Sequence, residues 1–509
     1  MKTINLYKFS IGFLILGAVG CTDLEIEETD SRFGNLSGDF SGVDADANLT
    51  NLYNTLRGQI STQENLYALT EVSSDEQLVP TRGTDWGDNG VWRNLHAHTW
   101  DSNHNFIKGT WNNFNQMIFN ATSIIDSRSS PTEQQAAEAK FIRGYCMFQL
   151  LDLFGQVPFR TPDEGSDVYP SVMSRAEALD FVLNDLNEAL PVLPTSGPSA
   201  DLNKPTKAAV RFLLAKIYLN KHIYLGTETP ASADMTEVVN LVNAIQADGF
   251  ALQEGYFDLF TDEVNTETIY FTTSDVGPRI WNTLHYKQNS PDNTGGGWNG
   301  FTTLAEFYDL FEGDPNVNVP GSGQEERRGF VPTDGSHLGI GYGFLINQQY
   351  DATGAAMTDR PGNPLAYTKD LPGLLGNNEI TGIRIIKYHP ENGAFANHEV
   401  VFRYADAHLM KAEAIANGGT SSEDALVLVN QLRTLRGATP LASLSDQDIL
   451  DERGRELYEE MWRRNDLIRF GQFTQPWAFK DNTEDFRVLY PIPATAIITN
   501  PNLVQNPGY

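Results

Sequence analysis

The feature that most constrains the fold is a set of apolar residues that recur every three to four positions. In the clearest segment, Ser130 can cap a helix, Pro131 can open it, and Glu133 stands where a capping box has its acid. The pattern ends at Gly155. The apolar residues of this segment are Ala137, Phe141, Tyr145 and Phe148. The segment is therefore predicted to form one long amphipathic helix.

The same period appears in other parts of the chain, at 174–190, 205–219, 402–416 and 425–435. A further helix is predicted after Ser445 and Asp448, with a stripe that includes Leu450, Leu457 and Met461. Successive helix pairs indicate a tetratricopeptide-like array, although no consensus repeat is legible at a fixed period. We predict a mainly α chain whose helical repeat scaffold covers about 46–250 and 400–509.

The region of about 251–399 has a different texture. Glycine-rich stretches, including 295–297, 321–323 and 339–343, separate short apolar segments. Residues 267–273 and 383–388 alternate as strands do. We predict a loop-rich ligand-binding insert with small β elements, because loops on a rigid scaffold commonly carry binding residues.

The charge of the chain excludes some partners. The formal net charge is -30, and no cluster of Lys and Arg interrupts it. Nucleic acid requires clustered basic residues that displace counterions from the phosphates, so it is not expected as a partner. A neutral ligand is not repelled by this charge.

The N-terminus has the pattern of a secretion signal over residues 1–20. Lys2 and Lys8 precede a short apolar run that cannot span a membrane. The small residues before Cys21 resemble a bacterial lipoprotein box, with Ala18 where such boxes usually carry Leu. We therefore predict lipid attachment at Cys21, followed by an acidic leader to residue 45. Cys146 would then be unpaired and is predicted to be a small core residue.

Several separated segments resemble the SusD/RagB family, in the order in which that family has them. They are AEAKFIRGY at 137–145, LFGQVP at 153–158, PTKAA at 205–209, LAKIYL at 214–219, RYADAHLMKAEA at 403–414, DERGREL at 451–457, RRNDL at 463–467, YPIP at 490–493 and the C-terminal 500–509. Their charged residues, such as Glu413, Arg453 and Glu456, are interpreted as ties within the scaffold and not as catalytic groups.

This resemblance implies a nutrient-binding lipoprotein, attached to the outer membrane by its lipid and exposed on the cell surface. It implies a glycan ligand and a SusC-like, TonB-dependent transporter as partner, over which the protein sits as a lid. Some relatives handle peptides or glycoproteins, so a peptide-binding lid is an alternative. No cofactor is implied.

A sugar-binding surface needs exposed rings for the apolar faces of the sugar and planar polar groups for its hydroxyls. Two segments, 81–92 and 281–300, contain such residues. The candidate binding residues are Arg82, Trp86, Asp88, Trp281, Tyr286, Trp298 and Asn299. Trp92 begins an apolar stretch and is predicted to lie in the core.

The sequence offers two other kinds of site. His96, His98 and His104 have a spacing that can chelate a metal, but solvated histidines are the favoured interpretation and no metal site is predicted. A glycoside hydrolase with two carboxylates is the rival from another class. No GxSxG, HExxH, Walker or Rossmann motif is present, and we predict a binding protein without a catalytic residue.

Overall fold

The computed structural model describes residues 40–509 apart from 166, 315–318, 320–322 and 396. The predicted signal peptide and Cys21 lie outside the described residues, as does most of the predicted acidic leader. Among the described residues, no helix is both long and apolar enough to cross a membrane.

Helices dominate the described chain. They are α1 Ala45–Ser61, α2 Val91–His96, α3 Asn105–Ile125, α4 Glu133–Phe154, α5 Arg175–Ala189, α6 Lys207–Leu225, α7 Ser232–Ala247, α8 Gly277–Thr283, α9 Ala305–Tyr308, α10 Tyr404–Ala416, α11 Ala425–Leu435, α12 Asp446–Leu457, α13 Arg463–Arg469 and α14 Ala494–Thr499. Short 3-10 helices include η4 Phe257–Phe260, η5 Glu326–Arg328 and η6 His337–Gly339.

The strands are short and form small antiparallel sheets. They are β1 Gln77–Leu78, β2 Val157–Phe159, β3 Ser171–Met173, β4 Thr268–Ser274, β5 Thr302–Thr303, β6 Gly329–Phe330, β7 Tyr342–Leu345, β8 Asn347–Gln348, β9 Ala366–Tyr367, β10 Arg384–Ile386 and β11 Asn397–Arg403. The pairs are β1–β5, β2–β3, β4–β11 and β8–β9, and one sheet has the order β10-β7-β6. In that sheet Arg384 faces Leu345 and Ile386 faces Gly343.

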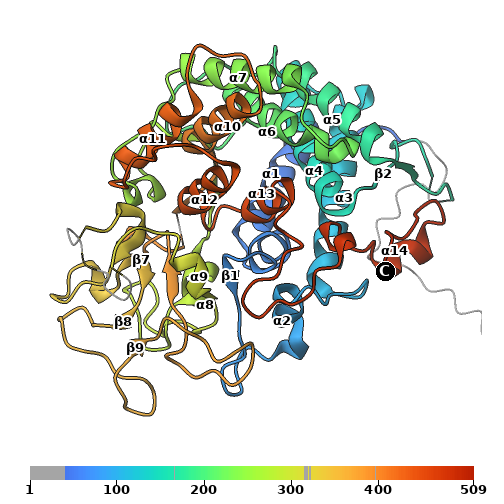
Figure 1. Cartoon of the computed structure of the whole chain (residues 1–509). Helices are drawn as coiled ribbons and strands as arrows, with labels where there is room; N and C mark the ends of the chain where they lie inside the picture. The colour runs from blue at the N-terminus through green and yellow to red at the C-terminus, as the bar shows by residue number, and fades with distance from the viewer. Residues whose placement is uncertain (1–39, 166, 315–318, 320–322, 396) are drawn as a thin grey trace, which may run out of the picture.

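Most of the helices gather in one part of the molecule (Figure 1). Two small sheets lie against them, because β2 and β3 contact α3, α4 and α5, and β4 contacts α1 and α6. Helices α3 to α7 pack against one another in succession, and α7 packs against α10, which packs against α11. Strands β6 to β10 and their loops gather at the lower left of the view, and α14 lies at the right beside the C-terminus. The predicted fold class is confirmed: the chain is mainly α, with a helical repeat scaffold and a loop-rich region of small β elements.

Helix α4 begins two residues later than the predicted cap. Thr132 is the N-cap, and its side chain and that of Gln135 bond reciprocally to each other's backbone N–H. Ser130 cannot serve because it adopts a left-handed conformation at φ 48°. The predicted end is confirmed, since Gly155 closes the helix at φ 70°.

Helix α12 is shorter than its apolar stripe predicted. Ser445 and Asp448 form the predicted capping box, but the helix ends at Leu457. Glu459 and Met461 then have positive φ values of 59° and 67°, so Met461 does not continue the helical face. The N–H of Met461 donates instead to the carboxylate of Glu71, which no local pattern could reveal.

The apolar interior falls into two main clusters. The larger one fills the helical scaffold and contains Trp92 and Cys146, as predicted for both residues. Burial raises the pKa of the Cys146 thiol well above its usual value. The second cluster lies in the insert and includes Leu78 from β1, Phe344 from β7 and Tyr458, which follows α12.

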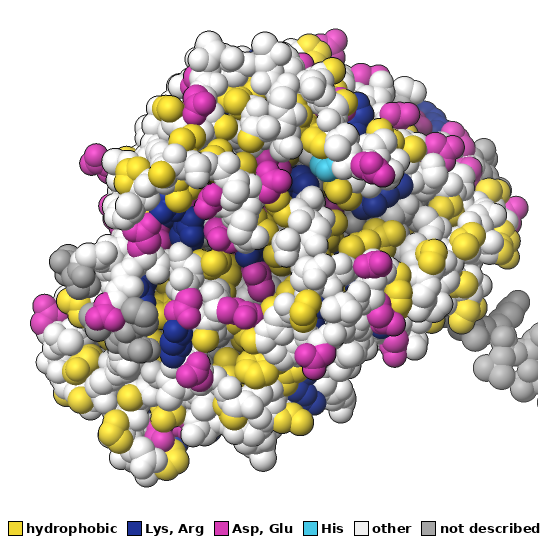
Figure 2. Space-filling view, in the orientation of Figure 1, with side chains coloured by type: hydrophobic (Ala, Val, Ile, Leu, Met, Phe, Trp, Pro, Cys, Tyr) yellow, Lys and Arg dark blue, Asp and Glu magenta, His cyan; other side chains and the backbone are white. Residues whose placement is uncertain are grey.

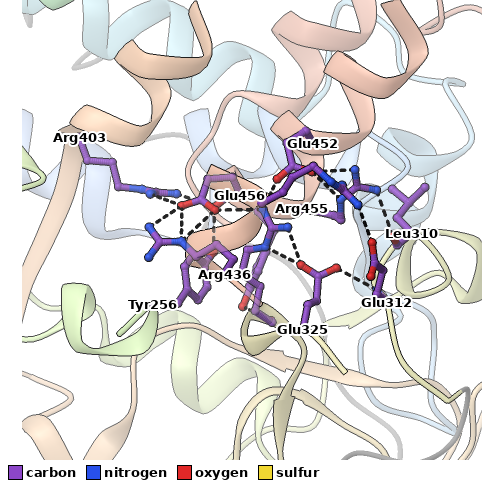
Figure 3. A network of polar contacts seen from close by, with 12 residues as sticks. Tyr256, Leu310, Glu312, Glu325, Arg403, Arg436, Glu452, Arg455 and Glu456 are labelled. Atoms are coloured by element: carbon purple, nitrogen blue, oxygen red, sulfur yellow. Dashed lines mark hydrogen bonds and ion pairs between the residues drawn. The ribbon is translucent and has the colours of Figure 1, made fainter. Parts of the chain in front are cut away.

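A buried ion network ties α12 to the insert and to β11 (Figure 3). Glu456 pairs with Arg327, Arg403 and Arg436 at 3.1, 2.7 and 3.0 Å. Glu452 pairs with Arg327 at 2.7 Å. Burial alone would raise the pKa of Glu452, but the neighbouring guanidinium groups outweigh it and lower that pKa to about 2.

A second group of buried charges joins helices α10, α12 and α13. Arg453 pairs with Asp406 and Asp466 at 2.8 Å each, and Glu413 pairs with Arg469 at 2.6 Å. All of these groups already have partners inside the scaffold. The interpretation of Glu413, Arg453 and Glu456 as structural ties is confirmed by these contacts.

Charges on the visible face are mixed. Figure 2 shows acidic side chains scattered over this face, with Lys and Arg singly or in small groups among them. No continuous basic stripe is visible on this side.

Candidate functional site

Trp86 is held between a buried aromatic layer and the surface. Its backbone is left-handed at φ 59°, and its side chain is half-buried. The ring meets Phe301 and Trp92 edge to face, with centroids 5.9 Å away in each case. The indole N–H donates to the carbonyl oxygen of Trp298 at 2.7 Å. This ring is therefore fixed in position while part of it faces solvent.

Trp298 is the most exposed tryptophan of the predicted set, with 64% of its surface accessible. Its backbone N–H donates to the carbonyl oxygen of Trp281 at 2.6 Å, which brings the loop back onto α8. A Cβ on Gly297 would lie 1.9 Å from the carbonyl oxygen of Leu284, and one on Gly300 would lie 2.3 Å from the ring of Trp86. The glycines predicted as loop residues thus allow a close backbone approach.

A chain of polar groups lies beside these rings. The hydroxyl of Tyr286 donates to Asp85, and the guanidinium of Arg360 lies 3.8 Å from the centre of the Tyr286 ring. Arg360 pairs with Asp85 at 3.2 Å and also with Glu379. The side chains of Arg360 and Asp85 are 52% and 38% exposed. We call Asp85, Trp86, Tyr286, Trp298 and Arg360 the aromatic site.

His285 bonds to Glu379, the carboxylate that pairs with Arg360. Burial lowers the pKa of His285 to about 4, so its ring is neutral near pH 7. The backbone N–H of Lys287 donates to Nδ1, which leaves the proton on Nε2. Nε2 lies 2.9 Å from Glu379 and donates to its carboxylate. Glu379 thus receives bonds from both His285 and Arg360.

Three of the predicted binding residues lie in the interior instead. Arg82 is 3% exposed, and its guanidinium donates to the carbonyl oxygens of Asn378 and Thr381 at 2.9 and 2.7 Å. Asn299 is fully buried and accepts from Arg384 at 2.7 Å. Because both side chains are buried and bond to neighbouring loops, they hold the loops and are not exposed to a ligand.

Trp281 is the third interior residue. It is 4% exposed and its ring stacks near Phe395, with centroids 6.4 Å apart. The expected exposure of Trp281 is wrong because α8 turns the side chain into the second apolar cluster. Asp88 lies at the surface, and its carboxylate accepts from the indole N–H of Trp92 at 2.9 Å.

The structure adds groups that the sequence did not indicate. Arg360 and Glu379 come from loops without periodic pattern, far along the chain from Trp86. Leu375 is 61% exposed, and the neighbouring carbonyl of Leu374 accepts from the N–H of Thr81. Only the pairing of these loops could have shown that they lie together.

The three clustered histidines are not solvated, so that interpretation is corrected. His96 and His98 are fully buried and His104 is 8% exposed. Their Nε2 atoms bond to the carbonyl oxygens of Ala478, Ser73 and Val91 at 2.9, 2.8 and 3.0 Å. Each ring therefore satisfies a different backbone group. In the described part of the chain, no group of three or more His, Cys, Asp or Glu residues could hold a metal ion.

The aromatic site can bind a ligand through ring stacking and hydrogen bonds. Indole and phenol rings present flat apolar surfaces, whereas Asp85 can accept and Arg360 can donate hydrogen bonds. A ligand with both apolar C–H faces and hydroxyl groups would match this combination. Anionic ligands have less to gain, because Arg360 is already shared between two carboxylates, those of Asp85 and Glu379.

Comparisons with known proteins agree with this architecture. Residues 266–509 match the family described as "SusD family", and residues 27–219 match the one described as "Starch-binding associating with outer membrane". The chain is 28% identical over 423 residues to "Starch-binding protein SusD" of Bacteroides thetaiotaomicron, covering 74% of this chain and 73% of that protein.

Solved structures show the same fold. A laminarin binding SusD-like protein superposes with a TM-score of 0.65 at 21% identity, covering 92% of this chain and 100% of that one. Surface glycan-binding protein A from Bacteroides fluxus gives a TM-score of 0.66 at 21% identity, covering 91% and 99%. With two matches that together span most of the sequence and a shared fold over nearly all of it, this chain belongs to the SusD/RagB family.

Proposed function

We propose that this protein binds neutral glycan at the aromatic site and passes it to an outer-membrane transporter. The observation that carries the proposal is the Trp86–Trp298 pair, which presents one fixed half-buried ring and one exposed ring beside polar groups. Support also comes from relatives whose names describe starch, laminarin or surface glycan binding.

Binding without hydrolysis fits the electrostatics of the site. A glycosidase needs a carboxyl whose pKa is raised so that it can protonate the leaving group. Burial acts to raise the pKa of Glu379, but bonds from Arg360 and His285 outweigh it and lower that pKa. Glu379 is therefore an ionised hydrogen-bond acceptor near pH 7. We propose that the aromatic site holds its ligand and does not cleave it.

Titration calorimetry with purified oligosaccharides tests this proposal. Starch and laminarin oligosaccharides are the first probes, with a peptide panel for the alternative of a peptide-binding lid. We expect at least one saccharide to bind saturably. The substitution Trp298→Ala should weaken that binding. Sustained release of reducing sugar from either polysaccharide would contradict the binding-only function, and saturable binding of peptides alone would favour the alternative.

Location and partner form the second part of the proposal. A lipid on Cys21 would hold residues 46–509 at the outer face of the outer membrane, and a SusC-like, TonB-dependent transporter would receive the glycan. The family resemblance supports it, as does the match of residues 27–219 to the family described as "Starch-binding associating with outer membrane". Within 46–509, the scaffold of about 46–250 and 400–509 would carry the ligand-binding insert of about 251–399.

Replacing the lipidated residue tests the anchor. Cys21→Ser should release the protein from the outer-membrane fraction and leave its glycan affinity unchanged. Cys146→Ser is the matched control, because this buried cysteine lies in the helical core and should not affect membrane attachment. Co-purification of the lipidated protein with a transporter from detergent extracts tests the partner.

A further inference from the structure

A pocket of about 490 Å³ opens mainly in the insert. Its volume falls within the range of about 300–1,000 Å³ that small-molecule sites occupy. The described residues that line it are Phe257, Asp258, Gln324, Glu325, Glu326, Gly329, Phe330, His337, Tyr342 and Gly437. None of them belongs to the aromatic site, so the two sites use separate side chains.

Half-buried rings surround Tyr342 in this pocket. The centroids of Phe257, Phe330 and His337 lie 5.3, 6.0 and 5.2 Å from that of Tyr342. All four rings are partly exposed, so they form a wall against which an apolar face can pack. A set of core rings would instead be fully buried.

Contacts behind the wall fix Tyr342 in place. Its ring stacks on the buried His389 with centroids 4.2 Å apart, and its hydroxyl donates to Glu391. Nδ1 of His337 lies 2.7 Å from the same carboxylate oxygen of Glu391. Tyr342 and His337 are thus held by one acid, and a ligand need not order them on binding.

Close strand packing sets the position of these rings. Strand β6 pairs with β7, so that Phe330 faces Tyr342 across the sheet. A Cβ on Gly329 would lie 1.9 Å from the carbonyl oxygen of Tyr342, so only glycine permits this approach. His337 and Leu338, which precede β7, have positive φ values of 50° and 60°, a feature that often accompanies functional loops.

The acidic groups of the pocket are the carboxylates of Asp258, Glu325 and Glu326. Asp258 is exposed and Glu326 is half-buried, whereas Glu325 is already paired with the buried Arg327. No Lys or Arg side chain is among the described residues that line the pocket. This combination suits hydroxyl donors and repels anionic groups such as uronates and sulfates.

We propose that this pocket, centred on Tyr342 and Phe330, is a second binding site for neutral sugar. The aromatic wall would take the C–H face of a pyranose ring, and Asp258 and Glu326 would accept its hydroxyls. The choice of sugar as ligand rests on the proposed function of the protein. A polysaccharide chain bound at either site would raise the effective concentration of ligand at the other.

Native affinity electrophoresis tests the second site. The full-length mature protein runs in gels with and without soluble starch or laminarin, and retardation reports binding. The variants are Tyr342→Ala with Phe330→Ala, Trp298→Ala alone, and all three together. Tyr169→Ala is the control, because Tyr169 is 57% exposed and lies in neither site. Thermal unfolding of each variant shows whether it is folded.

Each outcome has a distinct meaning. We expect each site variant to keep part of the retardation, the combined variant to lose at least tenfold in apparent affinity, and the control to match the wild type. If the Tyr342 and Phe330 variant is folded and still retarded as the wild type is, the second site is overturned and the proposed function is untouched. A wild type retarded by neither polysaccharide would instead contradict the proposed function, and the second site with it.

Discussion

The indole N–H of Trp86 donates to the carbonyl oxygen of Trp298 across 2.7 Å, although 212 residues separate them in the chain. This bond ties the loop after β1 to the loop after α8, and it sets the half-buried ring beside the exposed one. Because the bond uses a backbone acceptor, its geometry depends on the path of the 284–300 loop and not on the Trp298 side chain. The two tryptophans therefore have different roles, which substitutions can separate.

Trp298→Ala should weaken glycan affinity without lowering the thermal midpoint, because the side chain is 64% exposed. Trp86→Ala should weaken affinity and also destabilise the fold by about 1–3 kcal/mol, since it removes ring contacts with Phe301 and Trp92. Calorimetric titration and thermal unfolding measure both effects. Equal stability losses in the two variants would contradict this division of roles.

Arg360 is expected to organise the polar side of the aromatic site. Arg360→Ala removes the partner of Asp85, Glu379 and the Tyr286 ring, so glycan affinity should fall about tenfold, or about 1.4 kcal/mol. Arg360→Lys should recover only part of this loss, because an ammonium cannot stack on the ring while bridging two carboxylates. The midpoint of unfolding should change little, since the side chain is 52% exposed. Full recovery by lysine would show that charge alone is needed.

The scaffold could be predicted from the sequence because helices have local sequence signals. Period, caps and a final glycine located α4 to within two residues. The buried polar residues have no such local signal, because their partners are distant in the sequence. Asn299 is held by Arg384, 85 positions away, and Arg82 by Thr381, 299 positions away. In the sequence both looked like loop residues available to a ligand.

Distant partners also explain why the burial of the three histidines and the role of Arg360 were not predicted. His98 packs against the rings of Phe473 and Trp477, and its Nε2 bonds to the carbonyl oxygen of Ser73. Nothing near His98 in the sequence indicates these partners. Arg360 stands in a loop directly before Pro361 and Gly362, where only the contact with Tyr286 reveals its role. Exposure of Trp298 was predictable, since glycines flank it and no apolar neighbour could bury it.

Removing one carboxylate from the buried ion network should be costly. Glu456→Gln would leave Arg327, Arg403 and Arg436 with too little negative charge in the interior. We expect a loss of about 3–5 kcal/mol in the free energy of unfolding, measured by urea denaturation. Glu484→Gln is the control, because its pair with Arg487 is at the surface and should matter by less than about 1 kcal/mol. Similar losses in both variants would contradict the network's role.

Stability should be greatest in mildly acidic solution. Burial raises the pKa of both Glu71 and Glu459 to about 7, above about 4.3 in the unfolded chain. The contribution of these two groups to the free energy of unfolding is complete below pH 4.3 and is lost as the pH rises through 7. Glu452 acts in the opposite sense. Its pKa of about 2 gives stability above pH 4.3, which is lost as the pH falls towards 2.

From these groups we expect a maximum in the free energy of unfolding near pH 5, with a fall on the order of a few kcal/mol towards pH 8. Urea denaturation across this range measures it. Glu71→Gln should flatten the slope between pH 5 and pH 8, because it removes one of the groups that must ionise. A wild type that becomes more stable from pH 5 to pH 8 would show that Glu71 and Glu459 are not held protonated.

The position of the Trp86 ring can be tested without touching that side chain. A Cβ at Gly300 would lie 2.3 Å from the ring, so Gly300→Ala must displace it. A Cβ at Gly87 meets nothing within 4 Å, and the φ of Gly87 is −70°, so Gly87→Ala is a matched control next to Trp86. We expect Gly300→Ala to lower glycan affinity at least fivefold and to change the indole fluorescence, because the ring leaves its bond to the Trp298 carbonyl. Gly87→Ala should do neither. Unchanged affinity in a Gly300→Ala variant whose fluorescence has changed would mean that the placement of Trp86 does not govern binding.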